Sequence, residues 1–265
     1  MKIEGRKIAL EIEKSLHINT VPTLAVILIG KDASSLNYVS QKLKVGIKTG
    51  IKVKLFRYDL NINIKTLEKF VISLNQDKKI HGIIIQRPVP LAVSSKRLNI
   101  MVSPNKDIDG FHPRSRFDPP VALAVTEILK SIRPFNFITW LKKQIILIIG
   151  RGETAGKPIA KYFIKKDFKV TVAHSQTINL KEMALSSNII ISCVGKSDIV
   201  RHDMVNSSTI LIGVGLHLKD NKLKPDYREE DIASKVAFYT PVPGGVGPVN
   251  VIMLMKNVIK AAKLA

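Results

Sequence analysis

The chain has 265 residues, of which 45% are hydrophobic, so it is long enough for one large or two modest domains with a buried core. No apolar run approaches the roughly 18 residues of a membrane span, and residues 1–6 lead into no hydrophobic signal segment, so we expect a cytoplasmic protein without a membrane partner. The formal net charge of +21 is spread along the chain and aromatic residues make up only 6%, which argues against a specific nucleic-acid-binding protein and fits either solvated lysine-rich faces or attraction of phosphorylated small molecules.

The N-terminal part of the sequence alternates predicted strands and helices. Residues 23–29 are a continuous apolar run that ends at Gly30, as expected for a buried parallel strand. The next elements are expected to be a helix at 34–49, a strand at 53–58, a helix at 64–74 and a strand at 82–86. A loop at 103–113 follows, and Pro119 and Pro120 indicate a domain boundary after residue 118.

The C-terminal part alternates in the same way. A helix at 121–132 is followed by apolar strands at 144–149, 168–173, 189–194 and 209–214, and then by a helix at 250–264. The single cysteine, Cys193, lies within one of these strands, where we expect a packed, unreactive thiol. The sequence therefore predicts an α/β protein made of two α/β domains.

A glycine-rich turn follows the predicted strand at 144–149. Gly150, Gly152 and Gly156 have the spacing G-x-G-x-x-x-G, one residue longer than the usual dinucleotide fingerprint. A strand, a glycine-rich turn and a helix N-terminus present backbone N–H groups and the helix dipole to a pyrophosphate. We therefore predict a Rossmann-like domain in which these glycines contact a dinucleotide cofactor.

The next predicted strand ends in a sequence without a carboxylate. An NAD site typically has Asp or Glu there to hold the ribose hydroxyls, whereas this chain has His174 and Ser175, with Arg151 in the preceding turn. The missing acid and the nearby arginine favour the additional phosphate of NADP over NAD. The alternative, in which Arg151 is a solvated surface residue and Ser175 caps a helix, stays open at this point.

Four polar residues of the N-terminal part are candidates for acid–base chemistry. Tyr38 and Lys42 are spaced i, i+4 on a predicted helix and share one face. Gln86 ends a predicted strand, where open α/β sheets bind ligands, and Asp109 lies in the following loop. A lysine beside apolar walls has a lowered pKa and exchanges protons near neutrality. Taken singly, the same residues also fit a surface lysine, a packed tyrosine and a turn aspartate.

The segment from Thr240 to Pro248 contains three prolines and three glycines in nine residues. Proline fixes φ and removes a backbone donor, while glycine allows conformations that other residues avoid. The segment is therefore either a stiff turn before the C-terminal helix or a loop whose backbone approaches a flat ligand.

Several of these segments carry a family resemblance when they are taken together. They are Tyr38-Val39-Ser40-Gln41-Lys42, residues 82–90, Lys106-Asp107-Ile108-Asp109-Gly110-Phe111-His112, residues 150–158, His174-Ser175-Gln176-Thr177 and residues 240–248. In order and spacing the chain resembles, over nearly its whole length, the bifunctional methylenetetrahydrofolate dehydrogenase/methenyltetrahydrofolate cyclohydrolase family.

The resemblance implies two steps on a one-carbon unit carried by tetrahydrofolate. Methylenetetrahydrofolate gives a hydride to NADP, and water then opens the methenyl cation to formyltetrahydrofolate. By the same resemblance, Lys42 is the main acid–base residue, Gln86 tunes Lys42, Tyr38 orients the folate rings and Asp109 binds the pterin. The other implied contacts are Gly215 for the cofactor and Pro243, Gly244, Gly245 and Pro248 for the folate, and no metal is implied.

The resemblance also implies an architecture. Residues 1–118 are expected to form the folate-binding catalytic domain, to which a C-terminal helix at 249–265 returns. Residues 119–248 are expected to form the NADP-binding domain, with the folate cleft between the two domains and a homodimer formed through the nucleotide-binding domains.

The departures from the family pattern lie in the second domain. Pro119-Pro120-Val121 replaces the usual Pro-Cys-Thr, Gly150-Arg151-Gly152 replaces Gly-Arg-Ser, Ile212-Gly213-Val214-Gly215 replaces Ile-Asp-Val-Gly, and Lys224-Pro225-Asp226-Tyr227 stands near the place of Gly-Asp-Val. The four residues assigned to the hydrolytic step are intact. A cyclohydrolase with weakened or absent dehydrogenase activity is therefore the alternative to a bifunctional enzyme, and a basic nucleic-acid-binding protein is a remote one.

Overall fold

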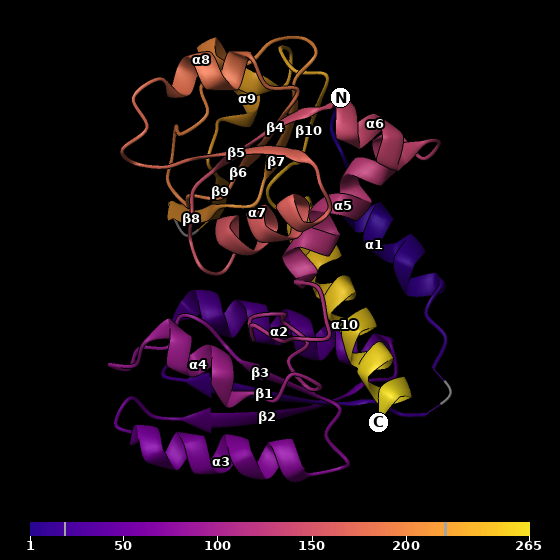
Figure 1. Ribbon diagram of the computed structural model, residues 1–265, viewed down its shortest axis with the longest axis vertical. Coiled ribbons are helices and arrows are strands. Elements are labelled where there is room, and N and C mark those ends of the chain that lie inside the picture. The colour runs from indigo at the N-terminus through magenta and orange to yellow at the C-terminus, as the bar shows by residue number, and fades with distance from the viewer. Residues whose placement is uncertain (19, 220–221) are drawn as a thin grey trace. The chain divides into compact units, whose positions relative to one another are not determined.

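The computed structural model describes residues 1–18, 20–219 and 222–265, and the chain forms two compact units (Figure 1). The three-stranded unit comprises Ile12–Pro120 and Val251–Ala265, and the five-stranded unit comprises Met1–Glu11 and Val121–Asn250. Both are built from parallel sheets with helices, as the alternating pattern predicted.

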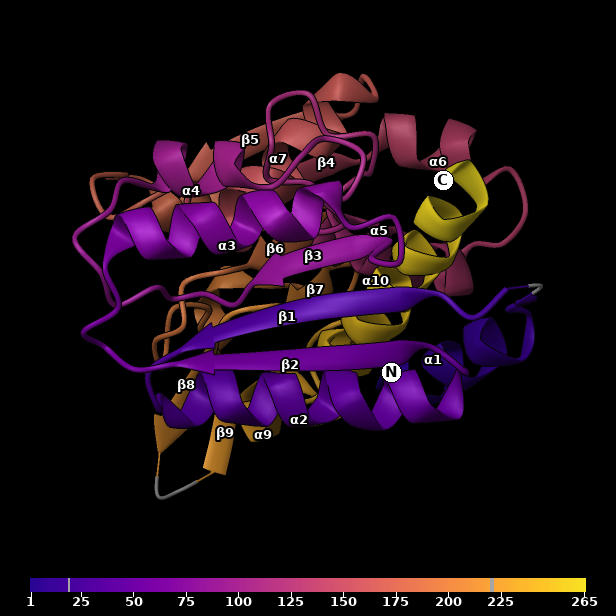
Figure 2. The ribbon, with the colours of Figure 1, turned by 90° about the horizontal axis from the view of Figure 1, so that it is seen from below.

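The three-stranded unit has a parallel sheet in the order β2-β1-β3 (Figure 2). Every residue of the middle strand is buried, because α2 and α3 cover opposite faces of the sheet (Figure 1). Ala25, Ile27 and Ile29 pack in one cluster with Leu67 and Val71 of α3. The elements here are α1 (Gly5–Lys14), which begins in the other unit, β1 (Thr23–Ile29), α2 (Ala33–Lys48), β2 (Lys52–Tyr58), α3 (Ile64–Gln76), β3 (Gly82–Ile85) and α4 (Ser95–Met101).

The five-stranded unit has a parallel sheet in the order β10-β7-β6-β4-β5. Its strands are β4 (Ile145–Ile149), β5 (Lys169–Ala173), β6 (Ile189–Ser192), β7 (Ile210–Gly213) and β10 (Phe238–Tyr239), with a separate antiparallel hairpin of β8 (Leu216–Lys219) and β9 (Lys222–Pro225). Its helices are α5 (Pro120–Ile132), α6 (Phe137–Lys143), α7 (Gly156–Lys165), α8 (Leu180–Leu185), the 3₁₀ helix η1 (His202–Met204) and α9 (Glu229–Ile232).

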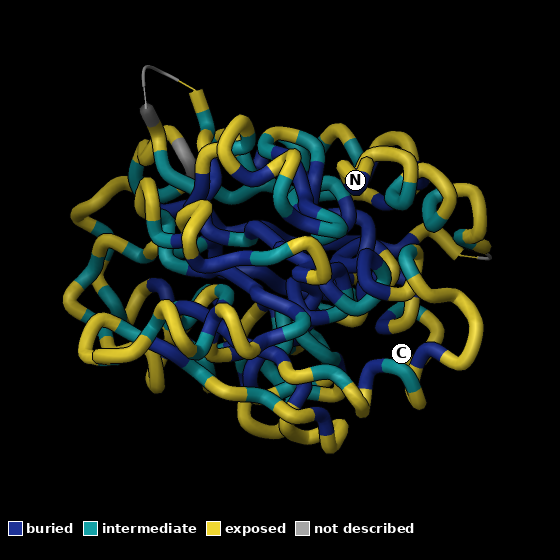
Figure 3. Tube along the Cα trace, turned by 90° about the horizontal axis from the view of Figure 1, so that it is seen from above, coloured by how far each residue is buried: buried dark blue, intermediate teal, exposed yellow. Residues whose placement is uncertain are grey.

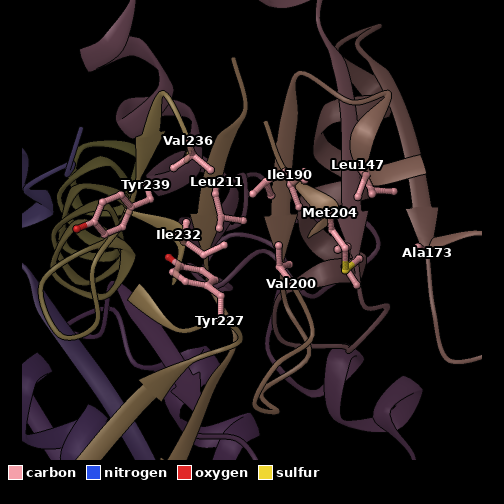
Figure 4. Close-up of a cluster of buried hydrophobic side chains, with 13 residues drawn as sticks. Leu147, Ala173, Ile190, Val200, Met204, Leu211, Tyr227, Ile232, Val236 and Tyr239 are labelled. Carbon is pink, nitrogen blue, oxygen red and sulfur yellow. The ribbon is translucent and has the colours of Figure 1, made fainter. Parts of the chain in front are cut away.

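The core of the five-stranded unit lies against the middle of its sheet. Leu147, Ile190 and Leu211, from three neighbouring strands, pack with Met204 and Ile232 (Figure 4). Burial follows the strands, since β6 and β7 are buried along their whole length while many loop and outer helix positions are exposed (Figure 3).

The N-terminal residues belong to the five-stranded unit, whereas the predicted boundaries placed them in the first domain with the rest of residues 1–118. Lys2 forms a parallel bridge with Tyr239, and the Ile3 N–H donates to the Tyr239 carbonyl at 2.8 Å. The chain start therefore extends the sheet edge at β10, a pairing across more than two hundred residues that local sequence patterns do not encode.

The C-terminal helix α10 (Val246–Leu264) begins earlier than the predicted residue 250. Pro248 lies in its first turn, where the missing N–H has no intrahelical acceptor to lose. From Val251 onward the helix belongs to the three-stranded unit, where Asn257 Nδ2 donates to the carbonyls of Ile108 at 2.9 Å and Asp118 at 3.0 Å. Among the residues that the structure describes, no helix is both long and apolar enough to span a bilayer.

Candidate active site

Lys42 and Gln86 form a buried hydrogen-bonded pair in the three-stranded unit. Lys42 Nζ donates to Gln86 Oε1 at 2.8 Å, and both residues are buried. Gln86 Nε2 donates to the Arg87 carbonyl at 2.9 Å, which orients the amide so that its oxygen faces the lysine. Lys42 and Gln86, which the family resemblance paired, are therefore in direct contact.

Local sequence explains how each partner of this pair is positioned. The α2 helix begins after Asp32, whose carboxylate accepts the Ser35 N–H at 2.8 Å, so Lys42 lies well inside the helix. Gln86 directly follows β3, and its N–H continues the sheet ladder to the Ile27 carbonyl at 2.9 Å. A rigid helix and a rigid strand end thus hold the two side chains together.

Asp109 completes the charged part of this site. Burial lowers the pKa of Lys42, and the charge of Asp109 opposes that shift. Burial raises the pKa of Asp109, while Lys42 and Arg87 favour its ionised form. Burial therefore shifts both groups toward their neutral forms, so that Lys42 loses its proton and Asp109 keeps its proton more readily than exposed side chains do, while the attraction between the charged forms opposes both shifts.

Tyr38 lies one helical turn before Lys42 on α2 and is half-buried. Burial raises the pKa of its phenol above the ordinary value of 10, so the hydroxyl keeps its proton at neutral pH. The phenol is therefore a hydrogen-bonding and stacking group here, and an unsuitable base.

The sequence patterns missed several side chains around Asp109. The Arg87 guanidinium lies 4.4 Å from the centre of the Phe111 ring and donates to Asn99 Oδ1. These three residues line a small pocket with Asp107 and Asp109. Their closeness in the sequence to predicted site residues could have identified two of them, because Arg87 directly follows Gln86 and Phe111 lies two residues after Asp109.

Asp107 holds the loop that carries Asp109. Its carboxylate accepts the His112 N–H at 2.7 Å, and its carbonyl accepts the Ser115 hydroxyl at 2.9 Å. Burial is the main cause that raises the pKa of Asp107 to about 6. Asp107 is therefore a structural partner of the site, fixing the loop from inside.

The glycine-rich turn of the five-stranded unit closes too tightly for side chains at two of its glycines. Gly150 has φ +105, and a Cβ on Gly156 would lie 2.0 Å from the Gly150 carbonyl oxygen. A Cβ on Gly152 would meet no atom within 4 Å. The strand, the tight turn and the N-terminus of α7 therefore form the backbone cradle that a dinucleotide pyrophosphate requires.

The predicted ribose-side residues gather at the same sheet edge. β4 and β5 pair in parallel with Ile149 opposite Ala173, so Arg151 and His174 both follow carboxyl ends of adjacent strands. His174 Nδ1 accepts the Gln176 N–H at 3.3 Å, which closes a short turn, and Ser175 is exposed. Ser175 lies ahead of α8 and is not its N-cap, because that position is occupied by Asn179.

Gly215 follows β7 at this edge, and its N–H donates to the Ser192 carbonyl at 2.9 Å. A Cβ on Gly215 would lie 2.3 Å from Oδ2 of Asp226. Glycine is therefore needed at this position to leave room for a buried carboxylate.

The proline- and glycine-rich segment forms a stiff loop at residues 240–245 and the first turn of α10 at residues 246–248, within the five-stranded unit. The Val242 N–H donates to Glu229 Oε1 at 2.8 Å, and the Gly244 carbonyl accepts the Arg6 N–H at 3.2 Å. A Cβ on Gly5 would lie 1.9 Å from the Gly245 carbonyl oxygen, so two backbones touch there. Pro243 is exposed, and Gly244 and Pro248 are partly exposed.

Across the described parts of the chain, no three His, Cys, Asp or Glu side chains are grouped so that they could hold a metal ion. Cys193 is buried, and burial raises the pKa of its thiol well above the ordinary range. It is therefore a packed thiol, as expected from the sequence.

Comparison with known families matches both units. Residues 3–109 match the family described as tetrahydrofolate dehydrogenase/cyclohydrolase, catalytic domain. Residues 119–265 match the family described as tetrahydrofolate dehydrogenase/cyclohydrolase, NAD(P)-binding domain.

Individual relatives extend the match over the whole chain. Bifunctional protein FolD of Bacillus velezensis is 34% identical over 272 residues, covering 99% of this chain and 94% of the relative. The solved structure of bifunctional FolD from Campylobacter jejuni has 31% identity and a TM-score of 0.89, covering 100% of this chain and 99% of that one. Trypanosoma brucei FolD, solved with NADP cofactor and inhibitor, has 28% identity and a TM-score of 0.90, covering 100% and 97%. This chain belongs to the tetrahydrofolate dehydrogenase/cyclohydrolase family.

Proposed function

We propose that this chain oxidises methylenetetrahydrofolate to methenyltetrahydrofolate with NADP and hydrolyses the product to formyltetrahydrofolate, as a bifunctional enzyme of one-carbon metabolism. The observation that carries the proposal is the buried hydrogen bond between Lys42 and Gln86, at 2.8 Å. It holds an amine of lowered pKa in place for proton transfer. Family membership supplies the substrate class.

Lys42 moves the proton of the hydrolytic step. Its neutral amine accepts a proton from the water that adds to the methenyl carbon. The resulting ammonium returns that proton to the ring nitrogen as the carbon–nitrogen bond breaks, and the added hydroxyl releases its proton to solvent as it becomes the formyl oxygen. Burial favours the amine and Asp109 favours the ammonium, so Lys42 titrates closer to neutral pH than an exposed lysine.

Asp109 and Tyr38 orient the folate. The Asp109 carboxylate accepts hydrogen bonds from the aminopyrimidine edge of the pterin, a role that needs an ionised acid. Burial raises the pKa of Asp109, and the charges of Arg87 and of Lys42 in its protonated form oppose that shift and favour the carboxylate. The Tyr38 ring packs on the folate, and further folate contacts come from Pro243, Gly244 and Gly245 in the loop before α10 and from Pro248 in the first turn of that helix.

The glycine turn holds NADP, which supplies the hydride acceptor when it is bound. The backbone passes so close to itself at Gly150 and Gly156 that no side chain fits at Gly156, as in a backbone cradle for the pyrophosphate. Arg151 binds the additional phosphate of NADP, and no carboxylate follows β5 to select NAD instead. Gly152, His174, Ser175 and Gly215 complete the proposed cofactor contacts.

We further propose that the protein is a cytoplasmic homodimer.

The tight glycine turn and the family matches favour the bifunctional enzyme over a cyclohydrolase with weakened or absent dehydrogenase activity. The nucleic-acid-binding alternative is not favoured by these matches.

A paired assay tests the proposed function. Reduction of NADP and of NAD is followed spectrophotometrically with methylenetetrahydrofolate, and methenyltetrahydrofolate hydrolysis is followed in the same preparation. We expect both activities, with NADP preferred to NAD. Hydrolysis without reduction of either nucleotide would support the cyclohydrolase-only alternative, and a folded protein with neither activity would refute the proposal.

A further inference from the structure

We propose that Asp226 is a positioning residue for the dinucleotide site, because its carboxylate fixes the loop at residues 193–196 against which the glycine turn closes. This inference rests on the proposed dehydrogenase function. Asp226 lies immediately after β9, in the segment that stands near the place of the family's Gly-Asp-Val but outside the predicted cofactor contacts, and it is fully buried with 0% of its surface exposed.

The carboxylate of Asp226 accepts four hydrogen bonds from one stretch of chain. Oδ2 accepts the Ser192 hydroxyl at 2.6 Å and the Val194 N–H at 2.8 Å. Oδ1 accepts the Gly195 N–H at 2.8 Å and the Lys196 N–H at 3.0 Å. A charged acceptor makes such bonds short and strong, and together they satisfy a carboxylate that is otherwise costly to bury.

Three consecutive N–H groups converging on one anion form a backbone nest of the kind that binds phosphate groups elsewhere. Gly195 has φ +74, a left-handed conformation that lets these N–H groups point the same way. Here the chain's own carboxylate fills the nest. The 194–196 nest is thus closed to the cofactor's phosphates, and its effect is to hold the loop in one shape.

This loop borders the glycine turn. β4 and β6 pair in parallel with Ile149 opposite Ser192, so the segments that follow them leave the sheet side by side. A Cβ on Gly150 would lie 3.0 Å from the Cys193 carbonyl oxygen and 3.3 Å from Val194 Cγ2. A shift of the 193–196 loop therefore moves the surface on which the pyrophosphate turn rests.

Asp226 also contacts neighbouring segments at the same edge of the sheet, through its backbone carbonyl and through the packing of its carboxylate. Its carbonyl accepts the N–H groups of Ile199 at 2.8 Å and Val200 at 3.1 Å. The missing side chain of Gly215, after β7, leaves the space that the carboxylate occupies. One buried acid thus fixes the chain on the carboxyl side of two strands of the sheet, the region where doubly wound folds bind dinucleotides.

Asp226→Asn tests the inference at nearly unchanged volume, since it removes the charge and turns one acceptor into a donor that faces N–H groups. We expect the dissociation constant of NADP, from calorimetric titration, and its KM in the dehydrogenase assay each to rise on the order of tenfold to a hundredfold, the penalty typical of a misplaced binding group. The rate of methenyltetrahydrofolate hydrolysis, whose acid–base pair of Lys42 and Gln86 lies in the other unit, is expected to stay within about twofold of wild type when it is assayed without NADP.

Two further variants keep the inference falsifiable if Asp226→Asn unfolds. Ser192→Ala removes one of the four bonds and is expected to raise the NADP dissociation constant in the same direction by a smaller factor. Tyr227→Phe is the matched control, because it removes a neighbouring buried hydrogen bond, to the Thr240 carbonyl, that does not touch the loop. It is expected to lower thermal stability and leave NADP binding unchanged.

The outcomes separate this inference from the proposed function. NADP affinity equal to wild type in folded Asp226→Asn, or in folded Ser192→Ala if the first variant unfolds, would overturn the positioning role while leaving the dehydrogenase function intact. If Tyr227→Phe weakened NADP binding as much as Asp226→Asn does, the effect would be a general loss of stability in this region, and the positioning role of Asp226 would also be overturned. A wild-type protein that binds no NADP would overturn the proposed dehydrogenase function, and this inference with it.

Discussion

Replacing Gln86 is expected to shift the proton equilibrium of Lys42 in a direction set by the replacement. Lys42 Nζ donates to Gln86 Oε1 at 2.8 Å within a buried site. A hydrogen bond from a charged donor contributes about 1.5–3 kcal/mol and one from a neutral donor about 0.5–1.5 kcal/mol, so this bond favours the ammonium by roughly 1–1.5 kcal/mol, or about tenfold in the protonation equilibrium.

Gln86→Met removes the acceptor with little change of volume, so Lys42 is expected to lose its proton at lower pH than in the wild type. Gln86→Glu puts a carboxylate in the same place, so Lys42 is expected to keep its proton to higher pH. Because the neutral amine is the base, the rate of hydrolysis rises with pH as Lys42 deprotonates.

The assay is kcat/KM for methenyltetrahydrofolate hydrolysis as a function of pH, after subtraction of the uncatalysed rate. The rising limb is expected to move to lower pH in Gln86→Met and to higher pH in Gln86→Glu. Gln76→Met, an exposed glutamine at the end of α3, is the control and leaves the limb in place. The coupling of Gln86 to Lys42 would be refuted if the rising limb of the pH profile moved in the same direction in both variants, or if it moved in neither of them.

Three further predictions concern the glycine turn, the loop that carries Asp109 and the C-terminal helix. Gly156→Ala places a Cβ 2.0 Å from the Gly150 carbonyl oxygen and is expected to weaken NADP binding, measured by calorimetry, whereas Gly247→Ala, in the first turn of α10, meets no atom within 4 Å and leaves NADP binding unchanged; equal effects of the two variants would contradict the cradle. Burial raises the pKa of Asp107 from its ordinary 3.8 to about 6, so the stability that this group contributes is present below about pH 4 and is lost as pH rises through 6, to a total of about 3 kcal/mol. Asp107→Asn is expected to remove that part of the pH dependence of the free energy of unfolding, measured by urea unfolding. A variant whose free energy of unfolding falls between pH 4 and 7 as steeply as that of the wild type would contradict this. Asn257→Leu leaves two backbone carbonyls without a donor and is expected to lower the free energy of unfolding by roughly 1–3 kcal/mol, seen as a lower urea midpoint at unchanged m-value.

The sequence was most informative where one local pattern decides the structure. Apolar runs within 23–29 and 144–149 predicted buried strands, because a strand covered on both faces has apolar side chains on both of them. The start of α10 was wrong by about a turn, because Pro248 was interpreted as part of the loop although proline is compatible with the first turn of a helix. Short helices such as α4 and α6 carry too few residues to show a period and were missed.

Residues that act through distant contacts were beyond local patterns. Asp226 holds a loop about 30 positions earlier in the chain, and Arg87 is brought to Phe111 and Asn99 by the return of the chain past β3. The contact between Lys42 and Gln86 was implied by the family resemblance, whereas helix spacing and strand end only marked each residue as a candidate. In the structure one residue lies on a helix and the other directly follows a strand, and these elements hold Lys42 Nζ 2.8 Å from Gln86 Oε1.

Hydrolysis of methenyltetrahydrofolate by Lys42→Ala is the most direct test of the central claim, that the buried lysine paired with Gln86 is the acid–base residue. The substitution removes the amine, so the hydrolysis rate is expected to fall on the order of a hundredfold to ten-thousandfold, the contribution of a positioned proton-transfer group. Thermal unfolding and NADP titration are expected to show a folded protein. A folded Lys42→Ala variant that hydrolyses methenyltetrahydrofolate at the wild-type rate would contradict the claim.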